Sequence, residues 1–347
     1  MATSDTISPL VAARSFVEGL RTIVIRSPNE YSFAGTTFPV APQQPTAGGA
    51  AIPPGEAMVA ALQAHLYGCL YNRPFTGTPV PPTPTSFTEL TEELSSANPG
   101  RERWDHGWQV YDVMANGVIQ AHKHGRAQMF YPGQYMVLGA SPGMPGAAVQ
   151  NGAFVSVYLA KELRNFQEGF YVVVGENVQT YYEQASLVRV YWNLTVDAAV
   201  PLVRELVSRF NRFQVPFRFK CLAFRELYDR FDAGVLFVGR RRWDIAALLV
   251  PEIYGRVNHA LGSEVPAFAK RLAPGLGLAE DPGTNESFGM SRCRLVAEAL
   301  WQAAASGQHS EPQRIEAIRT RFAQAGIAPD RPWLSPGSRD QYDVRID

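Results

Sequence analysis

Basic residues stand among apolar ones in two segments near the middle of the chain, where they could carry acid–base and phosphate chemistry. Arg189 and Tyr191 alternate with apolar residues in one segment, and Arg218 and Lys220 do so in the other. Alternation with a period of two is typical of a half-buried strand that has one face in the core. The pattern therefore predicts basic and phenolic side chains on one face of a rigid sheet, where a site that needs accurate geometry can form.

Lys220 is the candidate general base. It lies between Phe219 and Cys221 at the end of an apolar run. Its side chain either extends to solvent or is partly desolvated, and the local sequence does not separate these alternatives. Burial and nearby cations would both lower the pKa of the amine, because both favour its neutral form. A neutral amine can accept a proton at cytoplasmic pH.

Three arginines are candidate phosphate ligands, because the planar guanidinium fork suits phosphate. Arg189 and Arg230 lie among aromatic residues, and Arg292 follows Ser287 and Ser291 where a loop turns into a helix. A helix N-terminus has free N–H groups and a positive dipole end, so it can seat an anion. The alternatives are that each arginine pairs with a carboxylate on a solvated face and that the serines are ordinary helix caps.

A second basic group follows a predicted strand and comprises His122, Lys123, His124 and Arg126. The favoured interpretation is a basic turn in which Lys123 and Arg126 hold an anion. Two histidines at this spacing could also bind a metal ion, but no cluster of cysteine, aspartate or glutamate completes a ligand set. The sequence therefore predicts no metal site.

The elements that must position these residues follow from hydrophobic periodicity. The segment 187–238 is predicted to be strand, amphipathic helix, strand, strand, and the helix has apolar residues at helical spacing: Ala199, Val203, Leu206, Phe210 and Phe213. Further strands are predicted over 104–113, 117–122, 127–138, 154–159 and 170–174, with a hairpin turn at Asn116-Gly117. Further helices are predicted over 10–25, 58–67, 243–250, 253–261, 290–305 and 312–325. The predicted fold class is α+β, with a mixed or antiparallel sheet core, flanking helices and a helical N-terminal region.

Three parts are expected along the chain. Residues 1–100 form a helical region with a loop over 36–55 and a Pro-rich connector over 73–100. Residues 101–310 form the α+β domain, and residues 311–347 form a C-terminal helix and tail. The Gly- and Pro-containing segment 272–285 is predicted to be a loop, and roughly the last twenty residues are predicted to be poorly ordered.

Composition limits the classes of partner and the compartment. The chain has 32 basic and 32 acidic residues, so no net field favours nucleic acid or a membrane surface. Its three cysteines are far apart and lack metal-site spacing, which indicates a reducing compartment. No signal peptide is visible, and no stretch approaches the ~20 apolar residues that span a bilayer. The expected location is the cytoplasm, without a nucleic-acid or membrane partner.

The segment 187–238, together with residues 287–300, resembles the HopA-type effector family of plant-pathogenic bacteria. That domain recurs as the lyase subunit in clusters that make class V lanthipeptides and thioamitides, and the likeness covers about residues 100–305. The same segment is more distantly similar to the phosphothreonine lyases of enteric type III effectors, the OspF and SpvC group. Those lyases carry a basic residue and a histidine on one strand, then a helix, a strand with the base lysine, and an arginine.

The resemblance assigns roles to residues of this chain. Lys220 matches the base lysine, Arg189 the basic residue of the first strand, and Arg230 the following arginine. A late phosphate-binding arginine matches Arg292. Tyr191 stands where those lyases have their acid histidine.

Tyr191 in that position leaves the identity of the general acid open. Asn193 takes the position if the strand is shifted by two residues, and His122 or His124 could supply the acid from another strand.

The resemblance implies a phospholyase that eliminates phosphate from phosphoserine or phosphothreonine of a precursor peptide. The product would be a dehydroamino acid, to which a cysteine thiol can add to close a thioether ring. The scheme requires no metal or organic cofactor, and its implied partners are a phosphorylated precursor peptide and a separate peptide kinase. The alternatives are a non-catalytic phosphopeptide-binding or kinase-docking subunit and a type III effector.

Overall fold

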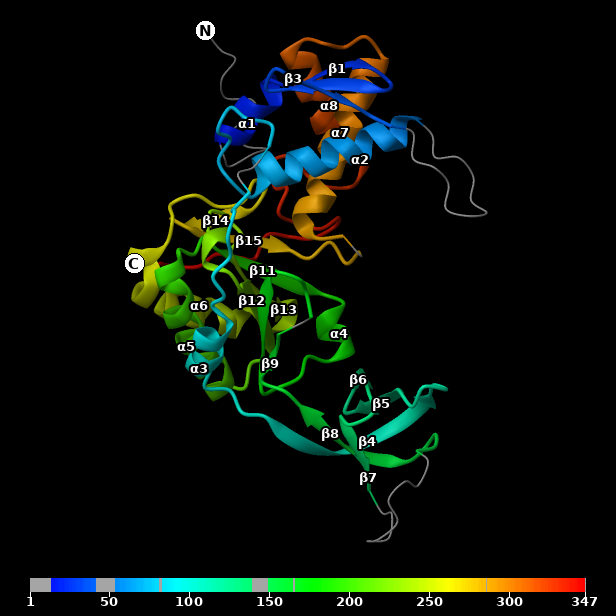
Figure 1. The fold of residues 1–347 in the computed structure, drawn as a ribbon, viewed down its shortest axis with the longest axis vertical. Helices are drawn as coiled ribbons and strands as arrows, with labels where there is room; N and C mark the ends of the chain where they lie inside the picture. Colours follow the sequence, from blue (N-terminus) through cyan, green and yellow to red (C-terminus); the bar gives the residue numbers. More distant parts are fainter. Residues whose placement is uncertain are drawn as a thin grey trace.

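The computed structural model describes residues 14–41, 54–80, 83–138, 149–164, 166–284 and 286–346. These residues contain three antiparallel sheets, of three, seven and five strands. Figure 1 shows the seven-stranded sheet in the middle of the long axis, with the five-stranded sheet at one end and the N-terminal elements packed with the last helices at the other. The structure confirms an α+β fold built on antiparallel sheets.

The seven-stranded sheet is the centre of the molecule. All of its strand pairs are antiparallel. In order across the sheet, its strands are β14 (Lys270–Ala273), β15 (Leu276–Glu280), β11 (Leu187–Trp192), β13 (Gly234–Gly239), β12 (Phe217–Leu222), β10 (Phe170–Val174) and β9 (Glu162–Leu163).

The predicted strand–helix–strand–strand unit is confirmed as β11, α5 (Val196–Arg212), β12 and β13. The apolar side of α5 is buried against one face of the sheet, together with α6 (Trp243–Val257) and α3 (Thr91–Ala97). One detail of the prediction is wrong: Phe213 follows the end of α5 and is 52% exposed, because Gln214 turns the chain with a φ of 54°.

The other face of the sheet is partly covered by elements from the two ends of the chain. Helix α2 (Pro54–Leu66), a π-helical turn η1 (Tyr67–Tyr71), α7 (Phe288–Ala305) and α8 (Glu311–Gln324) form one apolar cluster with Tyr191, Val235 and Ala279 of the sheet. These helices confirm the predictions over 58–67, 290–305 and 312–325.

The N-terminal region is not mainly helical, which corrects the sequence prediction. After α1 (Arg14–Arg21) the chain forms the three-stranded sheet β1 (Val24–Ser27), β2 (Glu30–Phe33) and β3 (Thr36–Pro39). The tight turn between β2 and β3 uses positive φ angles at Ala34 and Gly35. Phe33, which is fully buried, anchors this sheet against the helices.

The five-stranded sheet is formed by β4 (Arg103–Val113), β5 (Ile119–Lys123), β6 (Arg126–Phe130), β7 (Tyr135–Val137) and β8 (Phe154–Leu159). The predicted hairpin at Asn116-Gly117 is confirmed, and Gly117 has the left-handed φ of 79° that such turns need. This sheet has its own small apolar cluster around the fully buried Trp108.

Three segments predicted as loops or tails contain packed structure. The connector over 73–100 includes α3, and Leu94 of that helix is fully buried against α5. The segment 272–285 contains β15 and the end of β14. The C-terminal segment is packed rather than poorly ordered, because Tyr342 is fully buried on Trp243 and its hydroxyl donates to Glu280 Oε1 at 2.5 Å.

The remaining short elements are α4 (Tyr181–Gln184) and the 3₁₀ turns η2 (Arg225–Leu227), η3 (Arg240–Arg242) and η4 (Asn258–Ala260). Residues 243–257 form one helix that passes through Pro251, where the sequence predicts two. None of the helices in the described ranges has the length and apolar character to cross a membrane.

Candidate functional site

Arg189 and Lys220, two of the predicted basic residues, lie on one face of the seven-stranded sheet together with Arg218 and Tyr191. Strand pairing sets them in two rows across β11, β13 and β12, and these rows are Arg189–Phe237–Arg218 and Tyr191–Val235–Lys220. Because directly opposed residues of antiparallel strands point to the same side, both rows belong to one face. Two separate segments therefore supply one cluster of side chains.

The ring of Phe237 is the centre of the first row. The guanidinium carbons of Arg189 and Arg218 lie 5.3 Å and 5.8 Å from its centroid, and Lys220 Nζ lies 6.0 Å from it. A ring face attracts cations, so Phe237 holds three positive groups around one point.

Lys220 is half-buried within this group. Its amine lies 4.3 Å from the centroid of Phe170 and donates to Gln167 Oε1 at 3.1 Å. Burial is the main cause that lowers the pKa of the amine from 10.5 to about 8, and three neighbouring arginines lower it further while Asp232 opposes them. About a tenth of the amine is therefore neutral at pH 7, far more than for an ordinary lysine.

Arg230 reaches the cluster from the loop between β12 and β13. Its guanidinium carbon lies 5.9 Å from the centroid of Phe170, on which Lys220 also rests. Asp232 accepts two hydrogen bonds from Arg230, at 2.8 Å and 2.9 Å. Burial opposes the charge on Arg230, but Asp232 outweighs this effect and raises the pKa of the guanidinium.

The three arginines differ in their partners. Arg189 is paired with Asp281: its Nε donates to Oδ2 at 2.7 Å, and its Nη2 lies 2.6 Å from the same oxygen. Arg230 is paired with Asp232. Arg218 makes no ion pair with any residue that the structure describes and has only Phe237 beneath it. Arg218 therefore has a guanidinium free to receive an anion.

The π-helical turn η1 and the two residues that follow it hold the loop that carries Arg230. Phe231 N donates to Asn72 O at 2.6 Å, and Arg73 Nη1 lies 3.1 Å from Asp229 Oδ2. The Tyr67 hydroxyl donates to Asp232 and accepts from Arg230, both at 3.4 Å. π-Helical turns are often found at functional sites, and this one joins the N-terminal region to the basic cluster.

Tyr191 lies beneath the cluster rather than on its surface. It is 3% exposed, and its hydroxyl is buried without a hydrogen-bond partner among the described residues. Burial raises the pKa of this phenol, so it stays protonated across the range in which Lys220 titrates. Its ring lies 6.3 Å from that of Phe288, the first residue of α7.

Arg292 is near this group but its guanidinium points into the protein. It is 2% exposed and donates to the carbonyl oxygens of Pro332 and Leu334 at 2.8 Å and 2.9 Å. The guanidinium carbon of Arg292 lies 4.8 Å from the ring centroid of Phe288, and burial lowers the pKa of this guanidinium to about 10. Ser287 caps α7 by accepting from Met290 N at 3.2 Å.

The other predicted residues lie elsewhere. Lys123, on the five-stranded sheet, donates to Asp105 Oδ1 at 2.9 Å and to a backbone carbonyl. His122 is exposed and stacks on Tyr111 at 5.8 Å. His124 lies in the turn between β5 and β6, and Arg126 begins β6. Asn193 follows the end of β11 and donates to Glu264 O at 2.9 Å. The structure does not bring these three residues to the cluster. No group of three or more possible metal-ligating side chains occurs among the described residues.

Sequence reasoning missed four participants. Arg218 had the same period-two signal as Lys220 and could have been included from it. Asp232 follows Arg230 at a spacing of two, which is compatible with pairing. Tyr67 and Gln167 gave no local signal, because only the tertiary structure brings η1 and the β9–β10 loop to the sheet.

Taken together, these groups can bind an anion and hold a largely desolvated amine beside it. Residues 162–334, which contain the whole cluster except Tyr67, match the model of the HopA1 effector protein family. This part of the chain belongs to that family. The match begins at β9, so it leaves out the five-stranded sheet that the expected range of about 100–305 had included.

Two solved structures are similar to part of this chain. One is the effector protein from Pseudomonas syringae pv. tomato strain DC3000, with 19% identity, a TM-score of 0.39 and coverage of 48% of this chain and 62% of that one. The other is the effector protein from Pseudomonas syringae pv. syringae strain 61, with 12% identity, a TM-score of 0.36 and coverage of 49% and 66%. The chain thus spans less than two thirds of either effector. None of the curated proteins matches it.

Proposed function

We propose that this protein is a phospholyase that converts phosphoserine or phosphothreonine in a peptide into dehydroalanine or dehydrobutyrine. The observation that carries the proposal is Lys220, an amine whose pKa is lowered to about 8 among three guanidinium groups on one face of a sheet. An anion-binding protein needs the guanidinium groups but has no use for a neutral amine at their centre.

The chemistry of the elimination fits the groups present. Lys220, neutral, accepts the proton from Cα of the phosphorylated residue, the electron pair forms the Cα–Cβ double bond, and the Cβ–O bond breaks to release inorganic phosphate. Arg218 and Arg230 bind the phosphate and neutralise its charge as it leaves. Arg189 stabilises the negative charge that develops on the peptide carbonyl, a contribution of several kcal/mol in a site with little water.

A proton donor for the leaving oxygen must come from a group that stays protonated. Tyr191, in the same row as Lys220, is our proposed donor. Tyr67, which is within hydrogen-bond distance of Arg230, is a second phenol at the cluster, and burial raises the pKa of both. Neither phenol competes with Lys220 for the role of base.

We further propose that the phosphopeptide is a precursor of a ribosomal peptide natural product and that a separate kinase supplies its phosphate, inside the cell. A cysteine thiol of the same peptide can then add to the new double bond. The second candidate is an effector role, which the family description favours. Both roles use the same elimination and differ in the identity of the peptide.

The direct test is mass spectrometry of a synthetic phosphothreonine peptide incubated with the protein. Loss of one phosphoric acid per site identifies elimination, whereas an unchanged mass with tight binding identifies a phosphopeptide-binding protein. Lys220→Ala should abolish elimination and keep peptide binding, because the base is removed while the arginines remain. Lys220→Arg should behave likewise, because guanidinium retains the positive charge but does not deprotonate.

Lys123→Ala is the matched control, since it removes a lysine from the five-stranded sheet and leaves the cluster intact. Its elimination rate should equal that of the unaltered protein. Full activity in Lys220→Ala would disprove the assignment of the base.

A further inference from the structure

We infer that the cleft between the five- and seven-stranded sheets binds an uncharged stretch of the substrate peptide next to its phosphorylated residue. The inference rests on the proposed function and adds to it a site for the peptide chain. The cleft has a volume of about 410 Å³, which is within the usual range of about 300–1,000 Å³ for ligand sites. One of its walls is β6 with parts of β8, and the other is formed by the end of β10 and the start of β12 in the large sheet.

Amide side chains dominate the polar lining of the cleft. They come from both walls and comprise Gln128, Gln134, Asn177, Gln179 and Gln184. A primary amide has two donors and an acceptor, so it can pair with the N–H and C=O groups of an extended peptide backbone. The side-chain amides of Gln128 and Asn177 make no hydrogen bond with another described residue, whereas those of the other three bond within the protein.

The lining of this cleft carries much less charge than the basic cluster. Arg218 is the one ionisable cation among the lining residues, and no carboxylate lines the cleft. A charged peptide side chain placed there would lose water without gaining an opposite charge, which is costly. The lining therefore fits small uncharged residues, and the phosphate is the group attracted to Arg218.

Two links join the cleft to the proposed base. Arg218 is both a lining residue and a member of the cluster around Phe237. Phe166 lines the cleft and is 63% exposed, while the next residue, Gln167, accepts a hydrogen bond from Lys220 at 3.1 Å. A peptide that lies in the cleft thus continues directly to Lys220.

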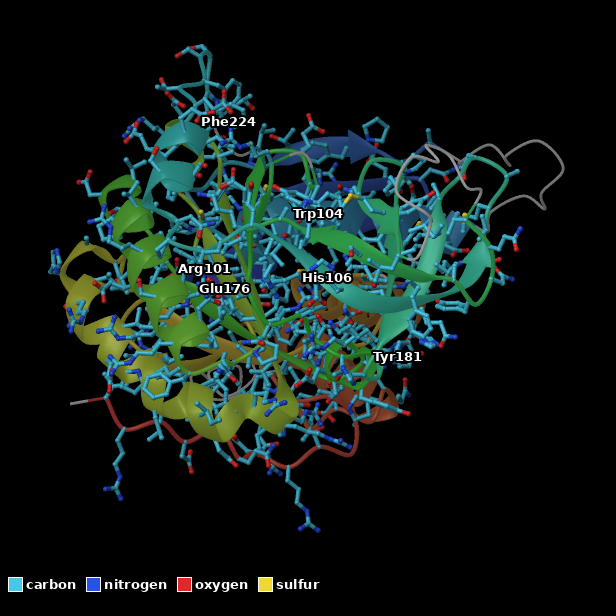
Figure 2. All side chains as sticks on the ribbon, turned by 90° about the horizontal axis from the view of Figure 1, so that it is seen from below. Arg101, Trp104, His106, Glu176, Tyr181 and Phe224 are labelled. Atoms are coloured by element: carbon cyan, nitrogen blue, oxygen red, sulfur yellow. The ribbon has the colours of Figure 1, made fainter. Side chains whose placement is uncertain are left out.

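The two walls are tied together at both sides of the cleft, so it is a preformed site. On one side Arg101 pairs with Glu176 at 2.9 Å, and on the other Tyr181 N donates to Gly125 O at 3.3 Å. Figure 2 shows Arg101 beside Glu176, with Tyr181 well apart from them. A preformed cleft costs a ligand less ordering free energy than one that must assemble.

The test compares two substrates in one assay. The short substrate is phosphothreonine blocked at both ends, and the long one is a peptide of serine, glycine and alanine around one phosphothreonine. Gln128→Trp, which fills the cleft, should raise KM for the long substrate about tenfold and leave kcat/KM for the short one unchanged. Met129→Trp is the matched control, because Met129 is exposed on the same strand and does not line the cleft.

Binding of the long peptide, labelled with fluorescein, gives a second readout that does not require turnover. Anisotropy should show weaker binding in Gln128→Trp and unchanged binding in Met129→Trp. If Gln128→Trp binds and processes the long peptide like the unaltered protein, the cleft is not its site, although the lyase proposal stands. If neither substrate is eliminated by the unaltered protein, the lyase proposal fails, and the anisotropy comparison still decides whether the cleft holds the peptide.

Discussion

At the scale of single residues, the protonation state of Lys220 results from opposing effects. Burial favours the neutral amine, three arginines act in the same direction, and Asp232 favours the charged form. Since Asp232 is bound to Arg230, its effect on Lys220 is partly balanced by the cation beside it. Burial and the local charges together thus lower the pKa from 10.5 to about 8, which brings the titration of the amine close to neutral pH.

The pH dependence of kcat/KM should report this amine. Because only the neutral form accepts a proton, the rate should rise about tenfold per unit up to pH about 8 and then level off. The rise in rate due to Lys220 is to be measured above pH ~6, where the phosphate of the substrate is mainly a dianion. A flat profile between about pH 7 and pH 9, about one unit to either side of the expected midpoint, would rule out Lys220 as the base.

The stability of the protein should change with pH in the adjoining, more alkaline range. The folded-state pKa lies below the unfolded value, so the unfolded chain binds more protons between pH about 8 and 10.5. The free energy of unfolding should therefore rise with pH across that range, relative to Lys220→Met.

Charge variants should shift the midpoint of the rate profile in opposite directions. Asp232→Asn removes the carboxylate that favours charged Lys220, so the midpoint should fall by about one unit. Arg218→Met removes a cation that disfavours it, so the midpoint should rise. Stopped assays over a pH series measure both, and shifts of the same sign would contradict the electrostatic explanation.

At the scale of elements, the site depends on contacts between segments that are remote in sequence. Strands β11, β13 and β12 set the two rows of side chains, while η1 holds the loop that carries Arg230. On the far side, α7 is joined to the C-terminal segment by the two hydrogen bonds from Arg292. These contacts indicate that Arg230 and Arg292 have different tasks, although both were predicted to bind phosphate.

Arg292→Met tests which task Arg292 performs. The change leaves two buried carbonyl groups without donors, so the free energy of unfolding should fall by about 1–3 kcal/mol. The folded fraction should keep its KM for a phosphopeptide, because the guanidinium is buried and directed into the protein. Thermal unfolding and kinetics measure the two effects. A large rise in KM at unchanged stability would instead support the predicted phosphate contact.

At the scale of the whole molecule, the HopA1-family residues do not make the site alone. The family match covers the large sheet and α5 to α8, but α2 and η1 lie outside it. Those N-terminal elements bury one face of the sheet and bring Tyr67 to Arg230. The five-stranded sheet, also outside the match, forms one wall of the proposed peptide cleft.

A chain that begins at residue 74 should therefore fold poorly. It would expose the apolar cluster that α2 shares with α7, and the Arg230 loop would lose its contacts to η1. We expect a loss of cooperative thermal unfolding and strong binding of a hydrophobic dye, together with loss of elimination. Cooperative unfolding at an unchanged temperature would show that the N-terminal region is a separate unit.

The sequence by itself determined the central unit, because its signals are local. Period-two alternation places Arg189, Arg218 and Lys220 on one side of their strands, and helical spacing identifies α5 whatever the surrounding fold. The turn at Asn116-Gly117 was predictable for the same reason, since its dipeptide chemistry is contained in the turn.

Tertiary structure decided the rest. Strand order places Lys220 and Tyr191 in one row with Val235 of β13 between them, and packing brings Tyr67 of η1 to Arg230. The packed C-terminal segment, like β14 and β15, has little periodicity of its own and takes its conformation from burial of residues such as Tyr342. Burial and neighbouring charge, which no local pattern contains, set the pKa of Lys220, and on this pKa the proposed chemistry depends.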